Sequence, residues 1–303
     1  MLMKDNMNRR QFLSQSACLA AGAAALGTLS PEPLRAADVS ASSGQSRLSA
    51  CIEALFTKVP FEQRLEEVKT AGLTAFEFWG WRNHPLDTLA RKKEETGLEL
   101  VAFSCETGGA LVAAGSEQKF LPPLKESIAA AKKLGCKRLI VTVGNELKDV
   151  PRSEQHKNIV TALKAGAPLC EDAGVTLVLE PLNVLVNHKG HYLSTSTEGF
   201  QILGEVGSPN VQLLFDIYHQ QITEGNLTEN ISRNIRKIGH FHVADVPGRH
   251  EPGTGEINYG NVFGAIVKAG YTGFVGLEMW PTADHATAIR QTLALFNAAL
   301  TRS

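Results

Sequence analysis

From Leu48 onward, short apolar runs rich in β-branched and aromatic residues alternate with longer amphipathic segments. The short runs have the length and composition of buried strands, while the longer segments repeat their apolar residues with a helical period. Eight strands are predicted, over residues 48–55, 75–79, 98–104, 138–143, 176–180, 211–218, 238–244 and 274–279. Eight helices are predicted between and after them, over residues 61–71, 85–96, 117–134, 154–173, 196–206, 228–236, 259–269 and 284–300.

Several of the predicted helices end on glycine, the residue that most readily adopts the left-handed conformation of a helix stop. Gly72, Gly135, Gly174 and Gly270 each follow a last helical turn, and a strand begins within a few residues. Strands and helices that alternate in this way, with no second domain, predict a single-domain α/β fold of the (β/α)8 TIM barrel type. An open doubly wound sheet is less favoured, because residues 56–60 after the first strand contain no glycine-rich phosphate loop.

The N-terminal segment has the features of an export signal. Arg9-Arg10 precedes an Ala/Gly-rich apolar run over residues 17–29, and small residues follow at Ala36-Ala37. This order predicts a Tat-type signal peptide over residues 1–37, a Ser/Gly-rich linker over 38–46 and the barrel over 47–303. We expect export by the Tat route to the periplasm and no stable membrane association after processing. A chance Arg-Arg pair, an uncleaved anchor and the cleavage site itself stay open.

Composition limits the classes of partner. The 303 residues are 43% hydrophobic and 20% charged, with a formal net charge of −1, which is ordinary for a globular protein and gives no reason to expect nucleic acid. None of the five cysteines forms a CxxC pair, so we expect buried free thiols more than a disulfide framework. A small-molecule substrate is the expected partner, and the sequence leaves open whether the chain forms a homo-oligomer.

Four predicted strands end in side chains that an apolar core could not hold unpaired. These strands are the last four along the chain, and the residues are Glu180, Asp216, His242 and Glu278. The C-terminal ends of barrel strands meet at one face, where the chemistry of such barrels takes place. Three carboxylates and an imidazole at that face would repel one another unless a cation lay among them. An oxygen-rich set of this kind favours Mn²⁺ or Mg²⁺, with Zn²⁺ or Co²⁺ as alternatives.

Further residues near these strand ends are candidates for substrate binding. His219 lies three residues beyond Asp216, and Arg249 lies in a long Gly/Pro-containing loop over residues 245–256. A surface histidine and a solvated arginine are the alternatives for these two. Glu77, Trp81 and Asn183 are weaker candidates for the pocket wall, and His240, two residues before His242, is expected deeper in the core.

Three stretches of the chain resemble the hydroxypyruvate isomerase family of the xylose isomerase-like barrel superfamily. They cover residues 179–183, 215–221 and 244–259, the last of which reads ADVPGRHEPGTGEINY. The resemblance implies a divalent metal held by Glu180, Asp216, His242 and Glu278, with Glu180 and Glu278 also acting as the acid/base pair. It implies isomerisation of hydroxypyruvate to tartronate semialdehyde through a cis-enediolate. One residue departs from the pattern, because members of this family often carry Gln where this chain has His242, whereas ketose 3-epimerases carry His.

Other functions therefore stay open. A ketose 3-epimerase or an inosose isomerase or dehydratase would use the same centre. An AP-endonuclease-like phosphodiesterase shares the barrel and the Asp216…His219 spacing, but it needs more histidine ligands and a basic surface for DNA. A non-catalytic sugar-binding barrel needs no paired Glu180 and Glu278.

Overall fold

The structure is a computed structural model, and it describes residues 47–302. The predicted signal peptide and linker lie outside the described residues, so the signal, its cleavage and export stay predictions. Among the described residues, no helix combines the length and the apolar character that a membrane span requires.

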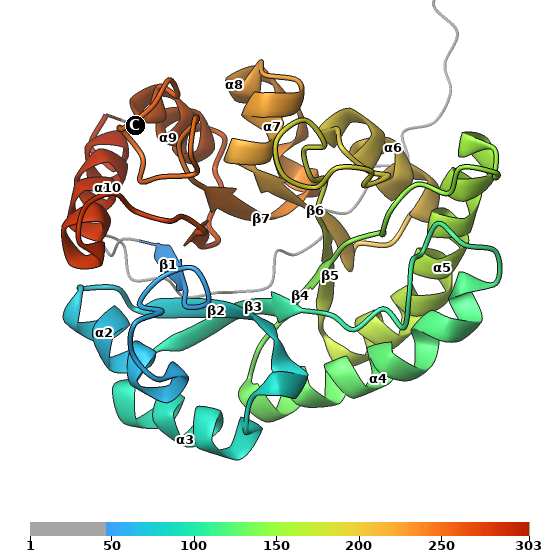
Figure 1. The fold of residues 1–303 in the computed structure, drawn as a ribbon, viewed down its shortest axis with the longest axis horizontal. Helices are drawn as coiled ribbons and strands as arrows, with labels where there is room; N and C mark the ends of the chain where they lie inside the picture. The colour runs from blue at the N-terminus through green and yellow to red at the C-terminus, as the bar shows by residue number, and fades with distance from the viewer. Residues whose placement is uncertain (1–46, 303) are drawn as a thin grey trace, which may run out of the picture. The chain divides into compact units, whose positions relative to one another are not determined.

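Eight parallel strands form a closed barrel in chain order, which confirms the predicted fold (Figure 1). The strands are β1 (Leu48–Cys51), β2 (Ala75–Gly80), β3 (Glu99–Ser104), β4 (Arg138–Val141), β5 (Thr176–Leu179), β6 (Val211–Asp216), β7 (Ile238–Val243) and β8 (Val275–Leu277). The ring is closed where Leu48 of β1 pairs with Val275 of β8.

Helices surround the strands on the outside of the barrel (Figure 1). Those described are α2 (Arg64–Thr70), α3 (Leu86–Thr96), α4 (Ser116–Leu134), α5 (Arg152–Ala173), α6 (Ser196–Val206), α7 (Ile217–Thr223), α8 (Leu227–Asn234), α9 (Tyr259–Lys268) and α10 (His285–Leu300), with 3-10 turns η1 (Phe61–Gln63), η2 (Trp81–Asn83) and η3 (Ile235–Lys237). Most of the apolar core lies in one cluster that includes residues of strands and helices alike. A smaller apolar cluster is contributed mainly by β2 to β6, and includes Val101, Ile140, Val178 and Leu214.

Several predicted strands extend too far, and the strand predicted over residues 48–55 already ends at Cys51. The strand predicted over residues 211–218 stops at Asp216, because Ile217 begins the short helix α7. The Asp216 side chain caps this helix by accepting a hydrogen bond of 3.0 Å from the backbone N–H of His219. The apolar pair Ile217-Tyr218 is therefore helical, and the helix start sets the position of His219.

Free cysteines are confirmed for the described part of the chain. Cys51, Cys105, Cys136 and Cys170 are buried and unpaired. Burial raises the pKa of the Cys136 thiol to about 12, so this sulfur stays protonated and behaves as a small apolar group.

Candidate metal centre and active site

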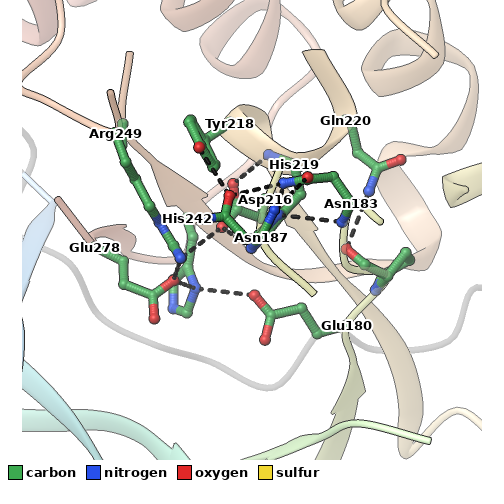
Figure 2. A network of polar contacts seen from close by, with 12 residues as sticks. Glu180, Asn183, Asn187, Asp216, Tyr218, His219, Gln220, His242, Arg249 and Glu278 are labelled. Atoms are coloured by element: carbon green, nitrogen blue, oxygen red, sulfur yellow. Dashed lines mark hydrogen bonds and ion pairs between the residues drawn. The ribbon is translucent and has the colours of Figure 1, made fainter. Parts of the chain in front are cut away.

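The four strand-end residues predicted as metal ligands lie together in the structure. One ligand atom from each of Glu180, Asp216, His242 and Glu278 can be chosen so that all lie within 4.8 Å of one another. We call these four residues the ligand cluster (Figure 2). The strand register explains the meeting, because Asp216 is the direct partner of His242 across β6 and β7.

The ligand cluster is buried and incompletely hydrogen-bonded. Nδ1 of His242 lies 3.3 Å from Oε1 of Glu180 and 3.1 Å from Oε2 of Glu278. Within the described chain, Oε1 of Glu180 and both ring nitrogens of His242 have no hydrogen-bond partner. Buried polar atoms normally have partners. Converging oxygen and nitrogen atoms without partners fit a divalent cation, which would satisfy them and neutralise the carboxylates.

A guanidinium supplies positive charge at this centre. Nη2 of Arg249 lies 2.5 Å from Oε2 of Glu278 and 3.5 Å from Oδ2 of Asp216 (Figure 2). Its guanidinium carbon lies 5.2 Å from the Tyr218 ring centre and 5.0 Å from that of Trp280. The predicted substrate-binding residue Arg249 is therefore brought to the site, where two aromatic rings fix its direction.

The two glutamates differ in their affinity for a proton. Burial, helped by the carboxylates of Glu278 and Asp216, raises the pKa of Glu180 from 4.5 to about 7 against the effect of His242. Burial also favours protonation of Glu278, but Arg249 and His242 outweigh it and hold that pKa well below its ordinary value. Two carboxyl groups whose pKa values are pushed apart suit the roles of acid and base.

His219 also faces the site, and Asn183 holds it there. The backbone N–H and the side-chain amide of Asn183 lie 3.2 Å and 2.6 Å from Nδ1 of His219. Because Nδ1 accepts these hydrogen bonds, the proton of the neutral ring is assigned to Nε2, which lies 3.6 Å from Oδ2 of Asp216. Burial lowers the pKa of His219 to about 4, so the ring is neutral near pH 7. Asn183 thus supports His219 and is not among the residues that line the cavity, so its contact with substrate stays a prediction.

The cavity in front of the ligand cluster has a volume of about 340 Å³. It is lined by Trp79, Ser104, Cys105, Ile140, Thr142, Glu180, Leu182, His188, His219, His242, Arg249, Glu278 and Trp280. Side chains of β2 to β4 and the segments after them thus face the ligand cluster across a pocket of the size that takes a small molecule.

Two of the weaker candidates, Trp81 and Glu77, are not among the residues that line the cavity. Trp81 lies outside the cavity wall, and its indole N–H points to Oγ of Ser127 on α4 at 3.2 Å. Glu77 is 1% exposed and also outside the wall, with Oε2 2.6 Å from Nε2 of His240. Burial opposes ionisation of Glu77, but His242 and His240 outweigh it and lower its pKa from 4.5 to about 2. His240 lies in the core as expected.

The wall residues that the sequence prediction missed include three with aromatic or imidazole rings, Trp79, His188 and Trp280. Residues two apart in a strand share a face. Trp79 follows Glu77 by two residues and is therefore nearer the C-terminal end on the same face. Its indole N–H donates a hydrogen bond of 3.0 Å to Oε1 of Glu278. Alternation along β2 could have identified Trp79, whereas nothing in the sequence singled out His188.

The loop that carries Arg249 is organised by two buried carboxylates. Asp245 accepts hydrogen bonds from the backbone N–H groups of Val246, Gly253 and Ile257 at 2.8–3.1 Å. Glu251 accepts from the backbone and hydroxyl of Thr282 and from the backbone of Ala283, which ties this loop to the segment after β8. Arg249 itself has φ of 61°, a left-handed conformation that the surrounding bonds maintain.

Comparison with known proteins agrees with this architecture. The family model described as xylose isomerase-like TIM barrel matches residues 65–299. A putative hydroxypyruvate isomerase of Danio rerio is 33% identical, over 78% of this chain and 90% of that protein. The hydroxypyruvate isomerase of Escherichia coli K12 is 31% identical over 80% of this chain and 97% of its own, and a 2-oxo-tetronate isomerase of Cupriavidus necator is 30% identical over 80% and 96%.

Solved structures show the same fold. A protein of Brucella melitensis described as AP endonuclease, family 2 has a TM-score of 0.78 and 28% identity, covering 82% of this chain and 98% of that one. An L-ribulose 3-epimerase has a TM-score of 0.73 at 21% identity, covering 85% and 95%, and shows the fold alone. The chain therefore belongs to the xylose isomerase-like TIM barrel family and, like the curated hydroxypyruvate isomerase relatives that it matches, is an isomerase.

Proposed function

We propose that this isomerase is metal-dependent and moves a proton between adjacent carbons of a small hydroxy-carbonyl compound. The observation that carries the proposal is the placement of Glu180 and Glu278, two buried carboxyl groups of unequal pKa that line one cavity on either side of His242. The first candidate reaction is the hydroxypyruvate isomerase-like conversion of hydroxypyruvate to tartronate semialdehyde. Relatives of that name support it.

The ligand cluster would hold the divalent ion, with Mn²⁺ or Mg²⁺ favoured by its three carboxylates. Such an ion, when bound, supplies Lewis-acid polarisation of a carbonyl and charge stabilisation of an enediolate. The fit rests on the buried, unpartnered atoms of Glu180 and His242.

The protein's own groups account for the proton transfer. A carboxylate of the pair removes a proton from the carbon next to the carbonyl, which leaves a cis-enediolate in the substrate. The resulting carboxylic acid, or its partner, returns a proton to the former carbonyl carbon. The proton of the original hydroxyl passes to the former carbonyl oxygen, so that the hydroxyl and carbonyl exchange places. Arg249 and the Nε2–H of His219 face the cavity as donors to the developing oxygen charge.

Replacing Glu180 or Glu278 with Gln tests this assignment. Each variant keeps the shape of the side chain but cannot take up a proton, so we expect turnover to fall at least about a thousandfold with the fold retained. Exchange of substrate C–H for deuterium in D₂O, followed by proton NMR, gives the readout on metal-reconstituted protein. Wild-type exchange rates in both variants would overturn the acid/base assignment.

A second candidate, an epimerase or isomerase of an uncharged ketose or inosose, is favoured by the charge of the cavity. Among the residues that line it, Arg249 is the one permanent cation, and it is already paired with Glu278. A substrate carboxylate would have to compete for that guanidinium. Return of the proton to the opposite face of the same carbon would give epimerisation. A panel of hydroxypyruvate, 2-oxo acids, ketoses and inososes in the same exchange assay separates the two candidates.

Export by the Tat route to the periplasm is a further part of the proposed biology, supported by the Arg9-Arg10 pair and the apolar run that follows. Replacing both arginines with lysine should keep the full chain in the cytoplasmic fraction. Equal periplasmic amounts of both forms would contradict the prediction.

A further inference from the structure

A second group of buried polar residues lies beside His242, away from the cavity. It consists of Glu77 on β2 and His240 on β7, which are 1% and 0% exposed. Neither residue lines the cavity, whereas His242 does. Glu77 and His240 can therefore act on the chemistry only through another side chain, and His242 is the residue that both groups share.

The contacts of His242 divide between its two ring nitrogens. Nδ1 faces Glu180 and Glu278 in the ligand cluster. Nε2 faces Oε1 of Glu77 at 3.4 Å, which is slightly longer than a hydrogen bond. A metal-binding histidine usually donates its other N–H to a carboxylate or carbonyl, which fixes the ring and leaves the metal-facing nitrogen free to bind. Glu77 is placed to be that acceptor.

His240 holds the other oxygen of Glu77. Its Nε2 lies 2.6 Å from Oε2 of Glu77, so the carboxylate is anchored at one oxygen and directs the second toward His242. Oε1 of Glu77 makes no hydrogen bond to the described residues. A buried carboxylate oxygen left without a donor is costly, and the Nε2–H of His242 is a donor beside it.

The neighbouring strand leaves room for this arrangement. A Cβ atom at Gly276 of β8 would lie 1.9 Å from Oε1 of Glu77 and 2.8 Å from Cδ2 of His242. A side chain at position 276 would therefore displace the carboxylate, the imidazole or both. Glycine at this position is explained by the close approach of Glu77 to His242.

We propose that Glu77 is a positioning residue for the metal centre. It accepts the Nε2–H of His242 and so presents Nδ1 of that ring to the divalent ion, while His240 fixes the direction of the Glu77 carboxylate. The inference rests on the metal centre of the proposed function and extends it to a residue that touches neither ion nor substrate.

A double-mutant cycle on Mn²⁺ binding tests the proposal. Chelator-stripped wild type, Glu77→Gln, His242→Ala and the double variant are titrated with Mn²⁺ in a calorimeter, and thermal unfolding confirms that each is folded. We expect Glu77→Gln to weaken binding about tenfold or more. In the His242→Ala background the same change should have no further effect, because its route to the ion is gone.

Two further variants serve as a control and as a replacement for Glu77→Gln. Glu224→Gln removes a partly buried carboxylate that accepts a hydrogen bond from the Ser196 backbone, away from the ligand cluster, and should bind Mn²⁺ as wild type does. His240→Gln loosens the anchor of Glu77 and should weaken binding in the same direction by less; it replaces Glu77→Gln in the cycle if that variant does not fold.

The outcomes are distinguishable. No Mn²⁺ binding by wild type would overturn the metal centre together with this proposal. Equal binding by wild type and Glu77→Gln, or a Glu77 effect that persists in full without His242, would overturn the positioning role alone. Two ions per chain, one of them lost in Glu77→Gln, would also overturn it, because Glu77 would then be a ligand of a second site.

Discussion

Individual side chains at the cavity are directed by specific hydrogen bonds. Glu278 receives the indole N–H of Trp79, and His219 receives two N–H groups of Asn183. Held in this way, a catalytic group loses little conformational freedom when a substrate arrives, which is the condition for efficient positioning. The bonds are therefore part of the chemistry of the site as well as of its stability.

Trp79→Phe should lower kcat/KM by about 10- to 100-fold. The ring is kept, but a hydrogen bond to a charged carboxylate is lost, which is worth about 1.5–3 kcal/mol. Steady-state kinetics on metal-reconstituted protein measures the effect. Trp280→Phe removes an indole from the same cavity wall but leaves the bond to Glu278, so it should cost less. Equal losses in the two variants would contradict the role given to the Trp79 indole.

His191 makes the stability of the chain depend on pH. Burial lowers its pKa from 6.5 to about 4, with the nearby His188 and His219 acting in the same direction. Between pH 6.5 and about 4, His191 is therefore mainly protonated in the unfolded chain and mainly neutral in the folded chain. Stability from this residue is fully present above pH 6.5 and is lost as pH falls toward 4, by up to about 3 kcal/mol.

Urea unfolding at several pH values between 7.5 and about 4 measures that loss. His191→Gln cannot titrate, so its free energy of unfolding should fall less steeply with acid than that of wild type. Both proteins are compared without metal, so that the other titrating groups cancel. Parallel pH curves would contradict the assignment to His191.

At the level of the element, the loop between β7 and α9 carries Arg249 and is held in place by buried carboxylates. Three backbone N–H groups converge on the fully buried carboxylate of Asp245, and the guanidinium carbon of Arg249 lies 5.0 Å from the ring centre of Trp280. The loop has one isolated bridge, between Asp245 and His250, and few other backbone hydrogen bonds, which the side-chain acceptors supplement.

Asp245→Asn should loosen this loop. An amide presents one acceptor where the carboxylate presents two, so a buried N–H loses its partner at a cost of about 1–3 kcal/mol. We expect a lower melting temperature, faster tryptic cleavage at Arg249 and a raised KM. Glu256→Gln, in the exposed part of the same loop, should change none of the three appreciably. Slow cleavage in both variants would contradict the structural role of Asp245.

The sequence predicted the elements well because the apolar runs and the glycine stops carry most of the information about a barrel. It failed at Ile217-Tyr218, since an apolar pair continues a strand as readily as it starts a helix, and only the capping contact of Asp216 decides. Trp81 is not among the residues that line the cavity, because β2 ends at Gly80 and the chain turns outward in η2. The ligand cluster was predictable from strand ends. The support by Asn183, Glu77 and Trp79 required three-dimensional contacts that no spacing reveals.

At the scale of the whole molecule, the ligands come from β5 to β8 and the segments after them, while the first half of the barrel supplies much of the facing wall. Binding an ion at this centre requires the folded barrel, because the four ligands lie far apart in an unfolded chain. Ion binding and folding are therefore linked by mass action.

Mn²⁺ should stabilise the chelator-stripped protein by about 2.7 kcal/mol at a free concentration a hundredfold above its Kd. Differential scanning calorimetry over a range of Mn²⁺ concentrations measures the rise in melting temperature. Asp216→Asn weakens the cluster and should reduce the rise strongly at the same concentrations. A rise of the same size in this variant would place the ion elsewhere.

The position of β8 has a consequence for biosynthesis. Because the ring closes between β1 and β8, the segment that completes the barrel is also the segment that brings Glu278, and it is synthesised after the segments that carry the other three ligands. A nascent chain on the ribosome can carry three of the four ligands, but it has neither the fourth nor the closed barrel. Binding of an ion by the complete ligand cluster would therefore follow synthesis of β8. If the Arg9-Arg10 signal directs the folded protein through the Tat route, the centre can be filled with a cytoplasmic ion before the protein leaves the cell interior.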